Sequence, residues 1–117
     1  MPLPASLNLL QTSIGELSAL LADDAITSVE LVQAYIANIE KNNIAGLGLR
    51  AIIQTAPNEL VLKIAEDLRQ QGTIRGPLHG IPVLVKDSIA TDPALGMDTS
   101  AGSTALGELH KNKPRFR

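Results

Sequence analysis

The 117-residue sequence contains no cysteine and almost no aromatic side chains. Without cysteine there can be no disulfide, no thiolate nucleophile and no cysteine-ligated zinc site. Tyr35 and Phe116 are the only aromatic residues. Nucleic-acid binders that stack bases on aromatic side chains need more of them than this. We therefore expect no nucleic-acid partner.

Metal-binding motifs, membrane spans and a signal peptide are missing as well. The two histidines, His79 and His110, stand in no HExxH or His-x-His spacing, so we expect no metal. No organic cofactor is expected either. No apolar run approaches the roughly 20 residues that a membrane-spanning helix needs. Residues 1–6 lack the basic and apolar regions of a signal peptide. A cytoplasmic protein is the default expectation.

What the sequence does contain is aliphatic side chains and an uneven distribution of charge. Hydrophobic residues make up 44% of the chain, which is enough for the core of one domain. Residues 107–117 carry four basic side chains against the single acidic Glu108, although the whole chain has a net charge of −2. We expect an extended lead-in at 1–11, a folded part at 12–106, and a basic tail at 107–117 that is either a polar end or a surface for an anionic partner.

Two capping boxes of the form Ser/Thr-x-x-Glu predict helix starts. Ser13 and Glu16 open a helix that runs to about residue 22, and Thr27 and Glu30 open a second that runs to about residue 41. A third helix is predicted over about residues 57–71, where proline suits the first turn and Gly72 suits the end. Apolar residues recur along each helix at steps of three and four, which indicates packing faces rather than functional sites.

Two short apolar segments, 49–54 and 81–85, are predicted to be strands. Helices alternating with strands favour an α/β fold with three main helices and about two strands. Strands that are apolar on both faces need neighbouring strands and covering layers, and the sequence supplies too few of them. We therefore expect an incomplete core and possible self-association through unpaired strand edges.

Residues 76–87, Gly-Pro-Leu-His-Gly-Ile-Pro-Val-Leu-Val-Lys-Asp, are the most informative stretch of the chain. A turn leads into the apolar segment, which ends at Lys86. A lysine in that position is ordinarily a solvated ammonium on a buried stem, but burial would make it a chemically useful neutral amine. His79 is more often a turn residue than a catalyst. Asp87 would favour the charged amine, so we expect its carboxylate to turn toward backbone donors in the following loop.

Several segments together resemble the amidase signature family. They are residues 76–87, Thr-Ser-Ala-Gly-Ser at 99–103, Thr-Ser-Val-Glu-Leu-Val at 27–32, and the predicted strand at 49–54. The resemblance covers about residues 12–106. It implies the N-terminal portion of a mixed-sheet α/β/α amidase fold, and a parent enzyme that hydrolyses the C–N bond of a small-molecule amide.

The resemblance also implies a mechanism and places Lys86 in it. In that family a serine attacks the carbonyl, and a second serine, held by a cis peptide bond, relays its proton to a neutral lysine. The resemblance assigns that lysine to Lys86. The family's two serines and oxyanion hole belong to a Gly-Gly-Ser-Ser-Gly type of segment, and no such run occurs in the 117 residues.

Three interpretations follow from this partial motif set. The first is a truncated amidase that carries only Lys86 and is inactive alone. The second is a non-catalytic α/β interaction module. The third is a subunit that completes an active site in trans with a chain that carries the serines.

Overall fold

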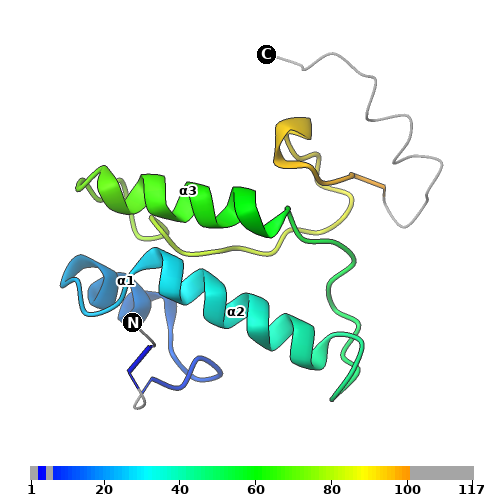
Figure 1. The fold of residues 1–117 in the computed structure, drawn as a ribbon, viewed down its shortest axis with the longest axis horizontal. Coiled ribbons are helices and arrows are strands. Elements are labelled where there is room, and N and C mark those ends of the chain that lie inside the picture. Colours follow the sequence, from blue (N-terminus) through cyan, green and yellow to red (C-terminus); the bar gives the residue numbers. More distant parts are fainter. Residues whose placement is uncertain (1–2, 5–6, 101–117) are drawn as a thin grey trace.

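The computed structural model describes residues 3–4 and 7–100. Three α-helices, α1 (Ile14–Ala22), α2 (Ser28–Asn42) and α3 (Asn58–Gln70), are followed by a short 3-10 helix, η1 (Pro93–Leu95). Helices α2 and α3 pack side by side and run in opposite directions, with α1 beside the start of α2 (Figure 1). The three predicted helices are confirmed. None of the helices within the described ranges has the length and hydropathy of a membrane span.

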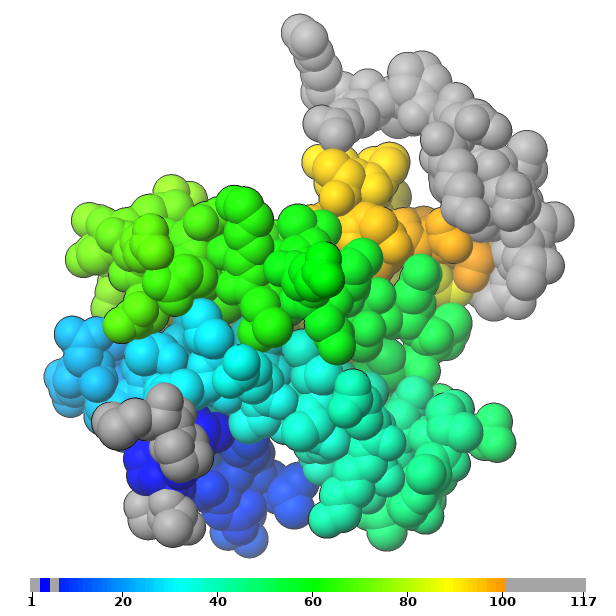
Figure 2. Space-filling model, in the orientation of Figure 1, coloured from blue at the N-terminus to red at the C-terminus, as the bar shows by residue number. Residues whose placement is uncertain are grey.

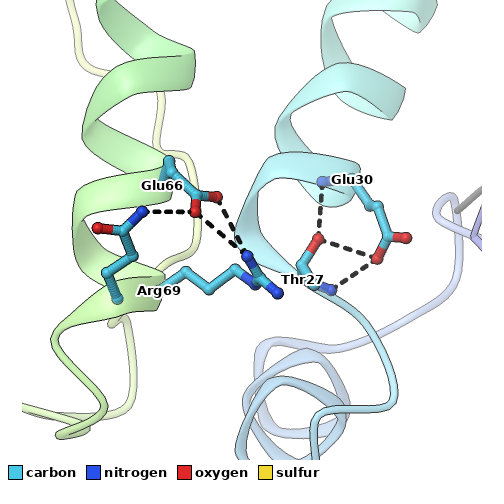
Figure 3. A network of polar contacts seen from close by, with 5 residues as sticks. Thr27, Glu30, Glu66 and Arg69 are labelled. Carbon is cyan, nitrogen blue, oxygen red and sulfur yellow. Dashed lines mark hydrogen bonds and ion pairs between the residues drawn. The ribbon is translucent and has the colours of Figure 1, made fainter.

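Both predicted capping boxes are present and define where α1 and α2 begin. The Ser13 N–H donates to Glu16 Oε2 at 2.7 Å, and the Glu16 N–H donates to Ser13 Oγ at 3.3 Å. In α2 the corresponding bonds join Thr27 and Glu30 at 2.8 and 3.2 Å (Figure 3). Each box satisfies backbone donors that a helix start would otherwise leave unpaired, so these two boundaries are fixed by local sequence.

The core is small and lies at the corner between α1 and α2. Leu17, Ile26 and Leu31 form a buried cluster, and partly buried side chains from the lead-in and from Ile81 pack against it. Ile26 precedes the cap of α2 and Leu31 follows it, which is the arrangement of a hydrophobic staple. The staple therefore fixes the angle at which the chain enters α2.

Helix α3 packs on α2 through a narrower face than the sequence predicts. Ala65 is its buried residue, whereas Ile64, which belongs to the predicted apolar stripe, is 38% exposed. Within α3, Glu66 accepts hydrogen bonds from Arg69 at 3.2 Å and from Gln70 at 2.9 Å, on the side that faces the start of α2 (Figure 3). The helix ends before Gly72, whose φ of +66° supports its prediction as the stop.

The prediction of two strands is wrong for the part of the chain that the structure describes. Residues 49–54 and 81–86 form no strand ladder. Ile52 instead pairs with a side chain: its N–H donates to Asn43 Oδ1 at 3.0 Å, and its carbonyl accepts from Asn43 Nδ2 at 2.8 Å. An apolar, extended segment becomes a strand only when another strand supplies the ladder. The α/β class is therefore not visible in this structure.

Parts of two sequence predictions lie outside the described residues. The 99–103 motif segment is described only as far as Ser100, and the basic tail at 107–117 is not described. The division of the chain into lead-in, folded part and tail therefore stays a prediction.

Candidate functional site

Segment 76–87 is anchored to the helices at Gly80. The Ser28 hydroxyl, in the first turn of α2, donates a buried hydrogen bond of 2.6 Å to the Gly80 carbonyl, 52 residues away in sequence. Gly80 has a φ of +78°, and a Cβ there would lie 3.3 Å from both Cβ and Oγ of Ser28. The left-handed backbone and the close approach of Ser28 both require glycine. Gly80 therefore allows this segment to pack closely against the start of α2.

His79 holds the turn that precedes this anchor. Its Nδ1 accepts a hydrogen bond from the Arg75 N–H at 3.4 Å, and its Nε2 lies 3.3 Å from the Leu68 carbonyl. Leu68 is in the last turn of α3, where helical carbonyls have no partner within the helix. An imidazole with its proton on Nε2 makes both contacts. His79 is a turn residue here, as the sequence favours.

A hollow of about 240 Å³ lies where α1, the start of α2 and residues 72–80 meet. His79, Gly80, Thr27 and Ser28 help to line it, but Lys86 does not. Since the polar atoms of Ser28 and His79 already bond within the protein, the hollow is a packing seam rather than a reaction site. Across the described ranges, no group of three His, Asp or Glu side chains could hold a metal ion.

Lys86 lies on the surface at the end of the extended segment 81–86. The preceding side chains are also exposed: Val83 by 64%, Leu84 by 73% and Val85 by 52%. Three adjacent apolar side chains in water are unfavourable and indicate a surface that can be covered. Nothing in the described part of the chain covers these side chains or Lys86.

Asp87 turns toward the loop that follows it. Its Oδ1 accepts the Ser100 N–H at 3.2 Å, and its Oδ2 accepts the Ser100 hydroxyl at 2.6 Å. This confirms the expectation that the carboxylate binds donors in that loop. The sequence alone does not single out Ser100 as the partner, although its place in the Thr-Ser-Ala-Gly-Ser segment is a signal that could indicate it.

The loop from 87 to 100 is hydrogen-bonded within itself and to the segment that leads into α3. Thr99 Oγ1 accepts the Thr91 N–H at 3.1 Å and donates to the Ile89 carbonyl at 3.4 Å. The Asp98 N–H donates to Gln54 Oε1 at 2.9 Å. In Figure 2 the gold and orange part of this loop lies against the green start of α3. Lys86 is therefore followed directly by an internally bonded loop.

Comparison with known proteins identifies the family that these motifs represent. Residues 30–114 match the Amidase family. This match covers most of the chain and includes both Lys86 and the loop that follows it. The chain belongs to the amidase family.

Similar proteins include amidases and subunits of amidotransferases. The chain is 38% identical over 109 residues to "Putative amidase C869.01" of Schizosaccharomyces pombe, which covers 91% of this chain and 18% of that protein. It is 41% identical over 90 residues to a glutamyl-tRNA(Gln) amidotransferase subunit of Chloroflexus aurantiacus, covering 75% and 17%. It is 36% identical over 107 residues to "Probable amidase At4g34880" of Arabidopsis thaliana, covering 89% and 20%.

The chain thus spans about a fifth of the length of the curated relatives it matches. No solved structure matches it significantly.

Proposed function

We propose that this chain supplies the catalytic lysine for hydrolysis of an amide C–N bond, and that this lysine is Lys86. The main support is the position of Lys86 in the motif of residues 76–87, within the region that matches the Amidase family. The segment that carries Lys86 is anchored at Gly80 and followed by the closed loop, so the lysine stands between two fixed points.

The proposed role of Lys86 is to accept a proton. A nucleophilic serine attacks the amide carbonyl, and its proton passes through a relay serine to the Lys86 amine. The proton then moves to the leaving nitrogen as the C–N bond breaks, which leaves the acyl group as an ester on the nucleophilic serine. Water then cleaves this ester and restores the serine hydroxyl. A serine hydroxyl is a weak nucleophile until a base is aligned with it. Lys86 can be that base only when neutral and within hydrogen-bond reach of the relay serine.

A neutral lysine requires a dry environment, which the exposed position of Lys86 does not give. We propose that the polypeptide carrying the two serines covers Val83, Leu84 and Val85 and thereby desolvates Lys86. The 117 residues contain no Gly-Gly-Ser-Ser-Gly run. We therefore expect no hydrolysis by the chain alone, because the nucleophile, the relay and the oxyanion donors would all be missing.

A second candidate is a subunit that completes the site in trans. One relative is named as a subunit of an amidotransferase, so members of this family also work within larger assemblies. The exposed apolar side chains at 83–85 are compatible with a partner chain in that place. A non-catalytic interaction module would use the same surface without chemistry.

Complementation tests the proposal. The chain is mixed with the portion of the Schizosaccharomyces pombe relative that follows its matched region, and ammonia release from a panel of aliphatic and aromatic amides is measured. We expect release only from the mixture, and Lys86→Met should lower it by about 100-fold or more, as loss of a general base does. Lys63→Met is the matched control, since Lys63 is an exposed lysine paired with Asp67 on α3.

Three results would argue against the proposal. Hydrolysis by the isolated chain would show that the serines are not required from elsewhere. Full activity in the Lys86→Met mixture would remove Lys86 from the mechanism. A stable complex that cleaves none of the amides would favour the interaction module.

A further inference from the structure

Asp87 is linked to Ser100 by the short bond at 2.6 Å and the second at 3.2 Å. A hydroxyl that donates to a carboxylate at this distance makes a charge-assisted hydrogen bond, which is stronger than a bond between neutral groups. Both carboxylate oxygens are engaged by one residue, so the direction of the Asp87 side chain is fixed. These bonds join the first and last residues of the 87–100 loop.

The hydrogen bonds between Asp87 and Ser100 also restrain Lys86, the residue directly before Asp87. The Lys86 carbonyl accepts the Ile89 N–H at 2.9 Å, which forms the first turn of the loop. The Ile89 carbonyl in turn accepts from Thr99, next to Ser100. The Lys86 carbonyl is thus hydrogen-bonded to the loop. Asp87, the next residue, closes the same loop through its bonds to Ser100.

The direction of the Asp87 carboxylate matters for the chemistry proposed for Lys86. A carboxylate close to an amine favours the ammonium form. The two hydrogen bonds from Ser100 instead direct the Asp87 carboxylate toward the loop. The arrangement therefore restrains the backbone next to Lys86 and holds the carboxylate of the neighbouring residue against the loop.

We propose that Asp87 and Ser100 act together as a clamp that positions Lys86; this inference rests on the amide hydrolysis proposed above. Asp87 is a positioning residue, because its bonds are made to the loop and it acts through Lys86. Nothing in its geometry gives it a role on the reacting atoms. The clamp holds Lys86 at a defined place next to the closed end of the 87–100 loop.

The first test needs no activity and uses the 117-residue chain. Amide hydrogen exchange of Ile89 and Ser100 is measured by NMR. Asp87→Asn and Ser100→Ala should each speed exchange at Ile89 by about tenfold, since each removes a bond to a charged group that closes the loop. Ser100→Thr keeps the hydroxyl and should restore slow exchange. Asp92→Asn is the control, because it removes one charge from the same loop and keeps an acceptor for the Ala94 N–H.

The double variant Asp87→Asn/Ser100→Ala tests whether the two residues act as a unit. Its exchange rate at Ile89 should equal that of the faster single variant, because either change already opens the clamp. Multiplied effects in the double variant would show two independent contributions. Unchanged exchange in both single variants would overturn the clamp.

The second test measures positioning in the complemented enzyme. Asp87→Asn should lower kcat by about 100-fold and change KM less than twofold, as expected when a catalytic group is displaced but substrate binding is retained. Ser100→Thr should retain most of the kcat, and Asp92→Asn should retain all of it. A wild-type kcat in Asp87→Asn would overturn the positioning role. If the wild-type mixture is itself inactive, the proposed function fails, and the exchange experiment still decides whether the clamp restrains Lys86.

Discussion

A hydrogen bond joins the Thr91 N–H to the hydroxyl oxygen of Thr99. The hydroxyl groups of the two residues differ in the hydrogen bonds that they make. Thr99 Oγ1 takes part in two hydrogen bonds, with the Thr91 N–H and the Ile89 carbonyl. Thr91 Oγ1 is buried without a hydrogen-bond partner among the residues that the structure describes. An unpaired buried hydroxyl costs stability, and a paired one contributes to it.

Replacing each threonine by valine should therefore have opposite effects. We expect Thr91→Val to raise the free energy of unfolding by about 1 kcal/mol, because it removes only an unpaired polar atom. Thr99→Val should lower it by about 1–3 kcal/mol, since it leaves two backbone groups unpaired. Urea denaturation of both variants measures the difference. Destabilisation by Thr91→Val would show that its hydroxyl has a partner in solution.

Gly80 and Gly72 both have positive φ, but only Gly80 has close neighbours. A Cβ at Gly80 would meet Ser28, whereas a Cβ at Gly72 would meet nothing within 4 Å. Gly72→Ala should lower the free energy of unfolding by about 1–2 kcal/mol, the cost of a left-handed alanine. Gly80→Ala should cost more, because steric contact with Ser28 is added. Urea denaturation compares the two, and equal losses would argue against a close approach of Ser28.

At the scale of the helices, the start of α1 depends on an ionised side chain. The backbone N–H of Ser13, and then its hydroxyl, donate to Glu16 and lower the pKa of its carboxyl below the ordinary value of 4.5. A lowered folded-state pKa contributes stability that is fully present above the unfolded-state pKa. That contribution is lost as the pH falls through the lowered value.

We accordingly expect the chain to lose stability below about pH 4.5, in part through Glu16. Urea midpoints of the wild type and Glu16→Gln are compared between pH 6 and pH 3. Glutamine can still accept the Ser13 N–H but does not titrate, so the variant should lose less stability over this range. Parallel curves for the two proteins would contradict the role of Glu16.

The helices could be predicted from the sequence because their signals are local. Ser13 with Glu16, and Thr27 with Glu30, are three residues apart, so each capping box is complete within one helical turn. The strands could not be predicted in the same way. Segments 49–54 and 81–85 have suitable apolar patterns, but a ladder depends on distant partners that the pattern does not contain. Likewise, no periodic pattern in the sequence indicates the two hydrogen bonds between Asn43 and Ile52.

For the candidate site too, features with a local sequence signal could be predicted, and features that depend on distant residues could not. The motif of residues 76–87 leads to the prediction that Lys86 is catalytic, which stays a prediction, and it anticipates the turn of Asp87 toward the following loop. The pairing of Asp87 with Ser100 could not be derived, because it depends on how residues 88–100 fold back. Nor does the packing of Gly80 against Ser28 follow from any spacing, since 52 residues separate them.

For the molecule as a whole, the exposed side chains at 83–85 are expected to promote association. Leu84→Lys should lower the associated fraction, because it places a charge in the centre of this apolar segment. Leu47→Lys is the matched control: Leu47 is 75% exposed and Leu84 is 73% exposed, but Leu47 lies in the loop after α2. Multi-angle light scattering over a concentration series measures the effect. Equal effects of the two substitutions would indicate general hydrophobicity rather than this segment.

The hydrogen bond from Ser28 to Gly80 has a consequence for the order in which the chain folds. The first two helices and their staple require only residues up to about 42, so they can form while later residues are still being synthesised. The Gly80 carbonyl then meets a partner that is already in place. Contacts of such long sequence separation close late, so the segment bearing Lys86 should be among the last to dock and the first to detach under mild denaturation.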